Sequence, residues 1–220
     1  MTDTESGTRV WDLPVRLFHW ALAVLILVLF ITGNLGGNWL EWHKRAGFTV
    51  LALLLFRVIW GLVGNYHARF VNFVRGPRRV AAYVKTLAAG TNKPFPGHNP
   101  LGALSVLALL VIVALQAVTG LFANDDIMLE GPFAAKVSKQ VSDFLTRIHK
   151  LNADLLLFLI ALHVLAIAYY YFVKKEDLLT PMFTGVKRLV SESAEMPRPP
   201  WLAWVIGAAT GIAIYLLVKN

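Results

Sequence analysis

Five stretches of the chain are long, apolar and nearly free of charged residues. Four of them contain no Asp, Glu, Lys or Arg, and the remaining one is interrupted only by Arg57. In chain order they cover residues 17–40, 46–68, 99–124, 155–173 and 199–218. Each is long enough to cross the hydrocarbon core of a bilayer as an α-helix, which takes about 20 residues. The pattern predicts an all-α integral membrane protein with five transmembrane helices.

The polar segments between these stretches predict shorter elements. We expect the second transmembrane helix to begin near His43, an amphipathic surface helix over residues 77–89, and an interfacial helix over residues 134–145. The first apolar stretch is too long for a signal peptide and is not closed by a small-residue cleavage site, so we expect it to be retained. The last helix carries Gly207 and Gly211 in a GxxxG spacing, which is typical of a homodimer or of a partner helix.

Lys and Arg residues are unevenly shared between the connecting loops. The loop between the first two helices has only Lys44 and Arg45. The loops after the second and fourth helices are richer, with Arg69, Arg75, Arg78, Arg79, Lys85 and Lys93 in one and Lys174, Lys175, Lys187, Arg188 and Arg198 in the other. Because basic loops stay in the cytoplasm, we expect a cytoplasmic amino terminus and an external carboxyl terminus.

Composition narrows the chemistry further. The net charge of +8 follows this topological signal and favours contact with anionic membrane lipid; no other feature points to nucleic acid. The chain has no cysteine, which excludes disulfides, iron–sulfur clusters, thiolate-ligated haem and covalent haem attachment. Any redox group must be held by nitrogen, oxygen or methionine sulfur.

Four histidines fall at two depths of the predicted bundle. His149 and His163 are fourteen residues apart, which places them on one helix face with about 21 Å of rise between them. By depth, His43 matches His149 at the outer level, and His19 matches His163 at the inner level. The other two histidines, His67 and His98, fall in or beside cytoplasmic loops.

Two histidines from different helices at one depth can hold a metal between them. Paired imidazoles fill both axial positions of a haem iron and favour electron transfer over oxygen chemistry. Arg16 and Arg57 would reach the inner level, where they could pair with haem propionates; the alternative is that both extend to lipid phosphates at the membrane surface. Interhelical hydrogen bonding and zinc or copper binding are the alternative interpretations of these histidines.

Several sequence segments resemble the bacterial cytochrome b561 superfamily, and in particular the b-type cytochrome subunits of nickel–iron hydrogenases. The similar segments are VWDLPVRLFHW, GLVGNYHARF, GHNPLGAL, HKLNADLLLFLIALH and KKEDLLTPMFTGVKR. They occur in order between about residues 9 and 190. The resemblance implies a four-helix transmembrane bundle over residues 1–190, to which residues 191–220 add a linker and a fifth transmembrane helix.

The resemblance also implies the cofactors and the setting. It implies two non-covalent haems b, held by His43 with His149 and by His19 with His163. It further implies a bacterial inner-membrane protein that passes electrons between an exported redox protein, of hydrogenase or cytochrome c type, and the quinone pool.

Three hypotheses for the function follow from this. The first is the electron relay, with a quinone site at His98, Asn99 and Arg69. The second is a stand-alone oxidoreductase that couples superoxide or another small molecule to quinone. The third, from a different class, is a haem-free membrane anchor or metal transporter.

Overall fold

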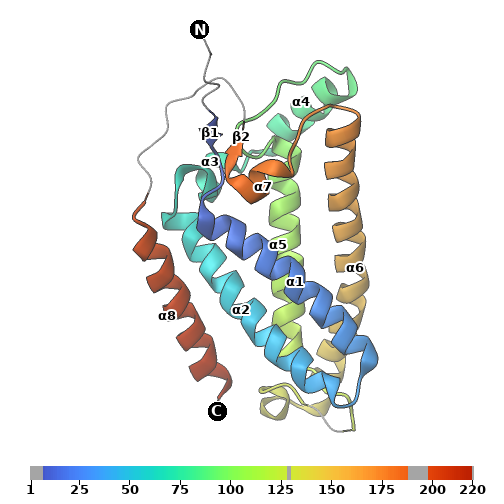
Figure 1. Cartoon of the computed structure of the whole chain (residues 1–220). Helices are drawn as coiled ribbons and strands as arrows, with labels where there is room; N and C mark the ends of the chain where they lie inside the picture. The colour runs from blue at the N-terminus through green and yellow to red at the C-terminus, as the bar shows by residue number, and fades with distance from the viewer. Residues whose placement is uncertain (1–6, 128–129, 188–197, 220) are drawn as a thin grey trace.

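Long helices form the body of the protein, and the part of the chain that the structure describes contains five of them (Figure 1). The computed structural model describes residues 7–127, 130–187 and 198–219. All five helices are long and apolar enough to cross a membrane, which confirms the predicted number of spans. They are α1 (Leu13–Leu35), α2 (Trp39–Val63), α5 (Pro100–Gly120), α6 (Lys139–Phe172) and α8 (Pro200–Val218).

The small elements gather at one end of the bundle, at the top of Figure 1, which we call the upper end. Two-residue strands β1 (Thr8–Arg9) and β2 (Val186–Lys187) pair antiparallel there. The short helices at this end are η1 (Tyr66–Ala68), α3 (Phe70–Phe73), α4 (Pro77–Ala88) and α7 (Thr180–Thr184). The helix predicted over residues 77–89 is therefore present, as α4.

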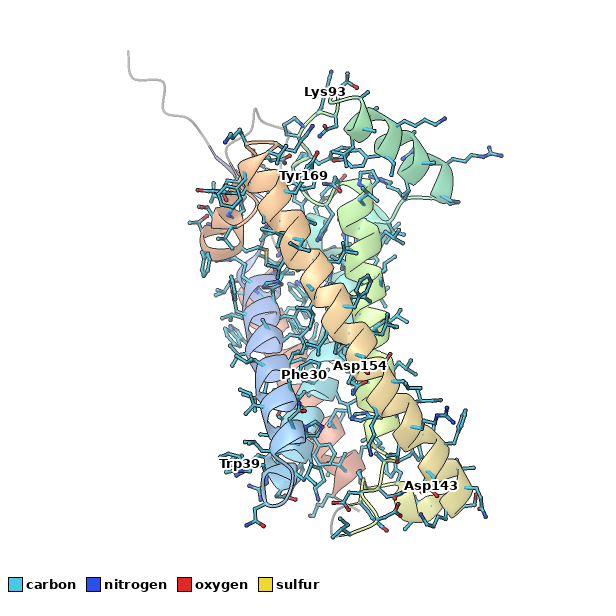
Figure 2. All side chains as sticks on the ribbon, turned by 90° about the vertical axis from the view of Figure 1, so that its right-hand side faces the viewer. Phe30, Trp39, Lys93, Asp143, Asp154 and Tyr169 are labelled. Atoms are coloured by element: carbon cyan, nitrogen blue, oxygen red, sulfur yellow. The ribbon has the colours of Figure 1, made fainter. Side chains whose placement is uncertain are left out.

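The lower end carries the α1–α2 turn, the segment between α5 and α6, and the carboxyl terminus. In Figure 2, Trp39 and Asp143 lie at this end, and Tyr169 and Lys93 lie at the upper end, so α6 runs the full length of the bundle. The boundary predicted between residues 190 and 191, and Arg188, lie outside the described residues.

Two predicted helix boundaries were wrong. Helix α2 begins at Trp39, one turn before His43, because Gly36 and Gly37 adopt positive φ angles of 64° and 53° and complete the reversal of the chain. The separate interfacial helix expected over residues 134–145 is not formed. Only a 3-10 turn, η2 (Ala134–Lys136), precedes Ser138, whose hydroxyl caps α6. No proline occurs between that cap and Phe172, so the helix continues for 34 residues.

Helix α2 lies at the centre of the packing and contacts α1, α5 and α8, while α5 packs on α6. Val50, Leu54, Val113 and Leu156 form a buried cluster in the middle of the bundle. Trp60 is the centre of a second cluster near the upper end and is only 1% exposed. Large apolar side chains cover much of the outer surface, as expected where lipid tails surround the helices.

Candidate functional site

The four histidines predicted at two depths lie in two pairs. The ring centres of His43 on α2 and His149 on α6 are 6.1 Å apart. Those of His19 on α1 and His163 on α6 are 6.5 Å apart. We call these the lower pair and the upper pair. Each pair takes one member from α6, and the partners are those that the depth argument predicts.

The lower pair is oriented by backbone carbonyls. Nδ1 of His43 donates to the carbonyl of Leu29 at 2.9 Å, and Nδ1 of His149 donates to the carbonyl of Gln116, also at 2.9 Å. Since a carbonyl can only accept, the ring proton lies on Nδ1 in both rings. Nε2 of each ring therefore keeps the lone pair that binds a metal.

The same two-residue motif approaches both rings of the lower pair. The hydroxyls of Thr32 and Thr119 lie 3.4 Å and 3.2 Å from the two Nδ1 atoms. The glycine after each threonine leaves room for the ring, because a Cβ on Gly33 or Gly120 would lie 3.1 Å or 3.0 Å from the imidazole. Sequence reasoning missed these residues. The signal is a Thr-Gly dipeptide that begins three residues after each accepting carbonyl.

An amide pair on α5 and α6 adjoins His149. Nδ2 of the buried Asn152 donates to Oε1 of Gln116 at 2.7 Å and to the carbonyl of Ile112 at 3.0 Å. The side-chain nitrogen of Gln116 lies 3.2 Å from Nε2 of His149. A metal bound at Nε2 of His149 requires the Gln116 side-chain amide to turn away from it.

The upper pair has a different surrounding, in which buried nitrogens lack partners. Nδ1 of His19, Nε of Arg16 and Nη1 of Arg57 are buried and make no hydrogen bond. Another nitrogen of Arg16 donates to the carbonyl of Phe183 in α7. Arg57 is 3% exposed and stacks over the Phe70 ring at 4.7 Å. Buried cationic nitrogens without acceptors suit a bound group that carries carboxylates.

The residues predicted for a quinone site lie at the upper end but make different contacts. His98 is packed against the rings of Trp11 and Phe73, each at 4.6 Å. Burial, followed by the positive charge of Arg57, lowers the pKa of His98 to about 3. This lowered pKa favours the neutral imidazole at pH 7.

Asn99 and Arg69, the other two residues predicted for the quinone site, contact different neighbours. Asn99 caps α5, and its Nδ2 donates to the hydroxyl of Tyr170 at 3.1 Å. Arg69 instead lies over the ring of Tyr66, at 5.9 Å.

The geometry of both pairs fits a metal held between two imidazoles. Metal–nitrogen bonds of about 2 Å on each side, added to the ring radii, place the ring centres roughly 6 Å apart. Across residues 7–127, 130–187 and 198–219, no group of three or more His, Asp or Glu side chains could hold a metal. Two imidazoles at each level suit an iron whose other four ligands come from a porphyrin. The residues present therefore fit two haems.

Comparison with known proteins gives one family. Residues 10–185 match the model of prokaryotic cytochrome b561. No solved structure gives a significant match.

The relatives found have related names. A protein of Azotobacter chroococcum named "Probable Ni/Fe-hydrogenase B-type cytochrome subunit" is 28% identical over 82% of this chain and 88% of its own length. A protein of the same name from Azotobacter vinelandii is 33% identical over 53% of this chain and 59% of its own length. The "Probable Ni/Fe-hydrogenase 1 B-type cytochrome subunit" of Escherichia coli K12 is 24% identical over 54% of this chain and 61% of its own length. The family model covers most of the chain and includes all four paired histidines. The chain therefore belongs to the prokaryotic cytochrome b561 family, and it is a multi-pass b-type membrane cytochrome.

Proposed function

We propose that this protein is a di-haem cytochrome that carries electrons between an exported redox partner, of hydrogenase or cytochrome c type, and the quinone pool. The observation that supports this proposal best is that α6 brings one histidine to each of two pairs at different heights of the bundle. The ring centres within each pair are 6.1 Å and 6.5 Å apart. His43 and His149 would hold the lower haem. His19 and His163 would hold the upper haem, with Arg16 and Arg57 binding its carboxylates.

In this proposal the chain orients the histidine ligands and surrounds the haems with apolar side chains. When bound, haem b supplies reversible one-electron exchange at an iron with two imidazole ligands. The carbonyls of Leu29 and Gln116 fix the ring orientation of the lower pair. The buried cluster of Val50, Leu54, Val113 and Leu156 fills the bundle between the two levels. Apolar packing there keeps water from the electron path.

The distribution of Lys and Arg supports an inner-membrane orientation with the upper end in the cytoplasm. The lower pair would then meet an exported donor, and the names of the relatives make a nickel–iron hydrogenase the first partner to test. Quinone would bind near His98 and Asn99, with Arg69 at the same end. On α8, Gly211 faces open space, and it would be available to a second copy of the chain or to a partner helix.

The proposed relay is tested with the purified chain in liposomes that contain ubiquinone. A nickel–iron hydrogenase from the same bacterium, added outside under hydrogen, should reduce quinone only when the cytochrome is present. Loss of either histidine pair should abolish that reaction. Quinone reduction by superoxide at full rate without any partner would instead favour the stand-alone oxidoreductase. A colourless but folded protein that cannot take up haem would favour the anchor or transporter.

A glycine substitution tests the support of the lower pair. Gly120→Ala places a Cβ 3.0 Å from Cε1 of His149, so the ring must shift by a few tenths of an ångström and strain its bond to the Gln116 carbonyl. We expect a changed electron paramagnetic resonance signal and midpoint potential for one haem, with the other unchanged. Gly47→Ala is the matched control, because that position has no neighbouring atom within 4 Å. Identical spectra for the two variants would contradict the assigned role.

A further inference from the structure

A large cavity, which none of the four paired histidines lines, lies between α1, α2 and α8; His67 is among the residues at its border. Its volume is about 1570 Å³, which exceeds the roughly 300–1,000 Å³ of most small-molecule sites. It extends from the upper end, where Arg198 borders it, down to Thr49 and Thr210. From Pro200 to Thr210 the helix rise is about 15 Å, close to the depth of one leaflet of the hydrocarbon core.

The mouth of the cavity is basic. Arg9 on β1, Arg69 between η1 and α3, and Arg198 just before α8 all border it. These three cations come from separate parts of the chain and border the same cavity.

One carboxylate also borders the mouth, but its hydrogen bonds are used within the protein. Asp12 accepts from the backbone nitrogen of Val15 at 2.9 Å, from Nε1 of Trp60 at 3.0 Å and from Nδ2 of Asn65 at 2.5 Å. These neutral donors leave the charge of Asp12 in place, but three arginines border the cavity against this one carboxylate, so its border carries an excess of positive charge. Guanidinium groups are well suited to the oxygens of a phosphate.

The walls below the mouth are apolar. Leu17 and Phe18 of α1, Leu53 and Phe56 of α2, and Ala203 of α8 line them. Gly207 also faces the cavity, and no atom lies within 4 Å of the position that its Cβ would take. Helix α8 thus leaves space beside α2 that only an apolar molecule can fill within a membrane.

The location agrees with the headgroup level of a bilayer. Trp201 and Trp204 at the start of α8 are 62% and 63% exposed, and exposed tryptophan is enriched at the membrane–water interface. A basic opening at that level, above an apolar shaft one leaflet deep, matches the two parts of a phospholipid.

We propose that this cavity binds one anionic phospholipid, with its phosphate at Arg9, Arg69 and Arg198 and its acyl chains between α1, α2 and α8. The lipid would join α8 to the rest of the bundle. A neutral quinone uses neither the charge of the mouth nor the width of the cavity. The proposal depends on the cavity alone and is independent of haem ligation.

Native mass spectrometry of the full chain in mild detergent tests the proposal directly. The lipid-stripped protein is titrated separately with phosphatidylglycerol and with phosphatidylcholine of the same acyl chains. We expect one phosphatidylglycerol to bind at least tenfold more tightly than phosphatidylcholine. The triple variant Arg9→Gln, Arg69→Gln, Arg198→Gln should lose that preference. Arg75→Gln, Arg78→Gln, Arg79→Gln removes the same charge from the same end but away from the cavity, and should keep it.

A second pair of variants tests the acyl part without changing charge. Gly207→Leu fills the cavity and should reduce phosphatidylglycerol binding at least tenfold. Gly211→Leu is the matched control, because it too has no neighbour within 4 Å but does not line the cavity. Equal binding of both lipids by the native chain, equal effects of the two leucines, or a co-purified quinone that phosphatidylglycerol cannot displace would each overturn the proposal.

Discussion

Replacing His43 or His149 with alanine should remove the same haem and leave one haem per chain. Replacing His19 or His163 should remove the other. In the proposed arrangement each pair would hold one iron, so the loss of either ligand would open the same site. A pyridine haemochrome assay gives the number, and redox titration of the purified variants identifies which haem remains.

Double variants make this prediction sharper. His43→Ala with His149→Ala should match either single variant, since both act on one site. His43→Ala with His163→Ala should lose both haems. His67→Ala should retain two, because His67 belongs to neither pair. Pairing by depth is wrong if His43→Ala and His163→Ala share a spectrum that differs from the spectra of the other two variants.

The second large effect is expected at Asp12, which ties the start of α1 to α2. Its carboxylate caps α1 through Val15 and accepts a hydrogen bond from the almost fully buried Trp60. Asp12→Ala removes a helix cap, worth about 1 kcal/mol, and leaves the indole nitrogen unpaired, at a cost of about 1–3 kcal/mol. We expect a clear fall in the melting temperature of the detergent-solubilised protein, followed by circular dichroism.

Asp12→Asn is the control for that measurement. Asparagine is as good a helix cap as aspartate, and its single side-chain oxygen can still accept a hydrogen bond. We expect it to retain most of the stability that alanine loses. Equal melting temperatures for the alanine variant and the native protein would show that these contacts contribute little.

The transmembrane framework could be predicted from sequence because lipid imposes a simple requirement. A charge-free stretch of about 20 residues has almost no alternative to a helix in a bilayer, and this was enough to find all five spans. Depth along those spans then brought His43 to His149 and His19 to His163. The ends of the helices were harder to predict from the sequence. The two glycines at positions 36 and 37 turn the chain more tightly than the hydropathy pattern indicates, and Ser138 begins α6 far outside its apolar part.

The supporting contacts of the site could not be predicted, because they depend on which carbonyl faces which ring. The Leu29 and Gln116 carbonyls belong to apolar stretches in which every residue has the same backbone acceptor. Nothing in the pattern distinguishes them before the helices are packed. Gln116, the single amide side chain within α5, and the two Thr-Gly dipeptides were visible in the sequence. They carried no assignment without the positions of the imidazoles.

Helix α6 contributes one histidine to each pair, whereas α1 and α2 contribute to one pair each. It also projects by more than two turns below His149, from Lys139 to the level where an external protein could touch it. In the proposed relay, a partner that displaced α6 on docking would move one histidine of each pair at the same time and would alter both haem sites together. A displacement of α1 or α2 would alter one site alone.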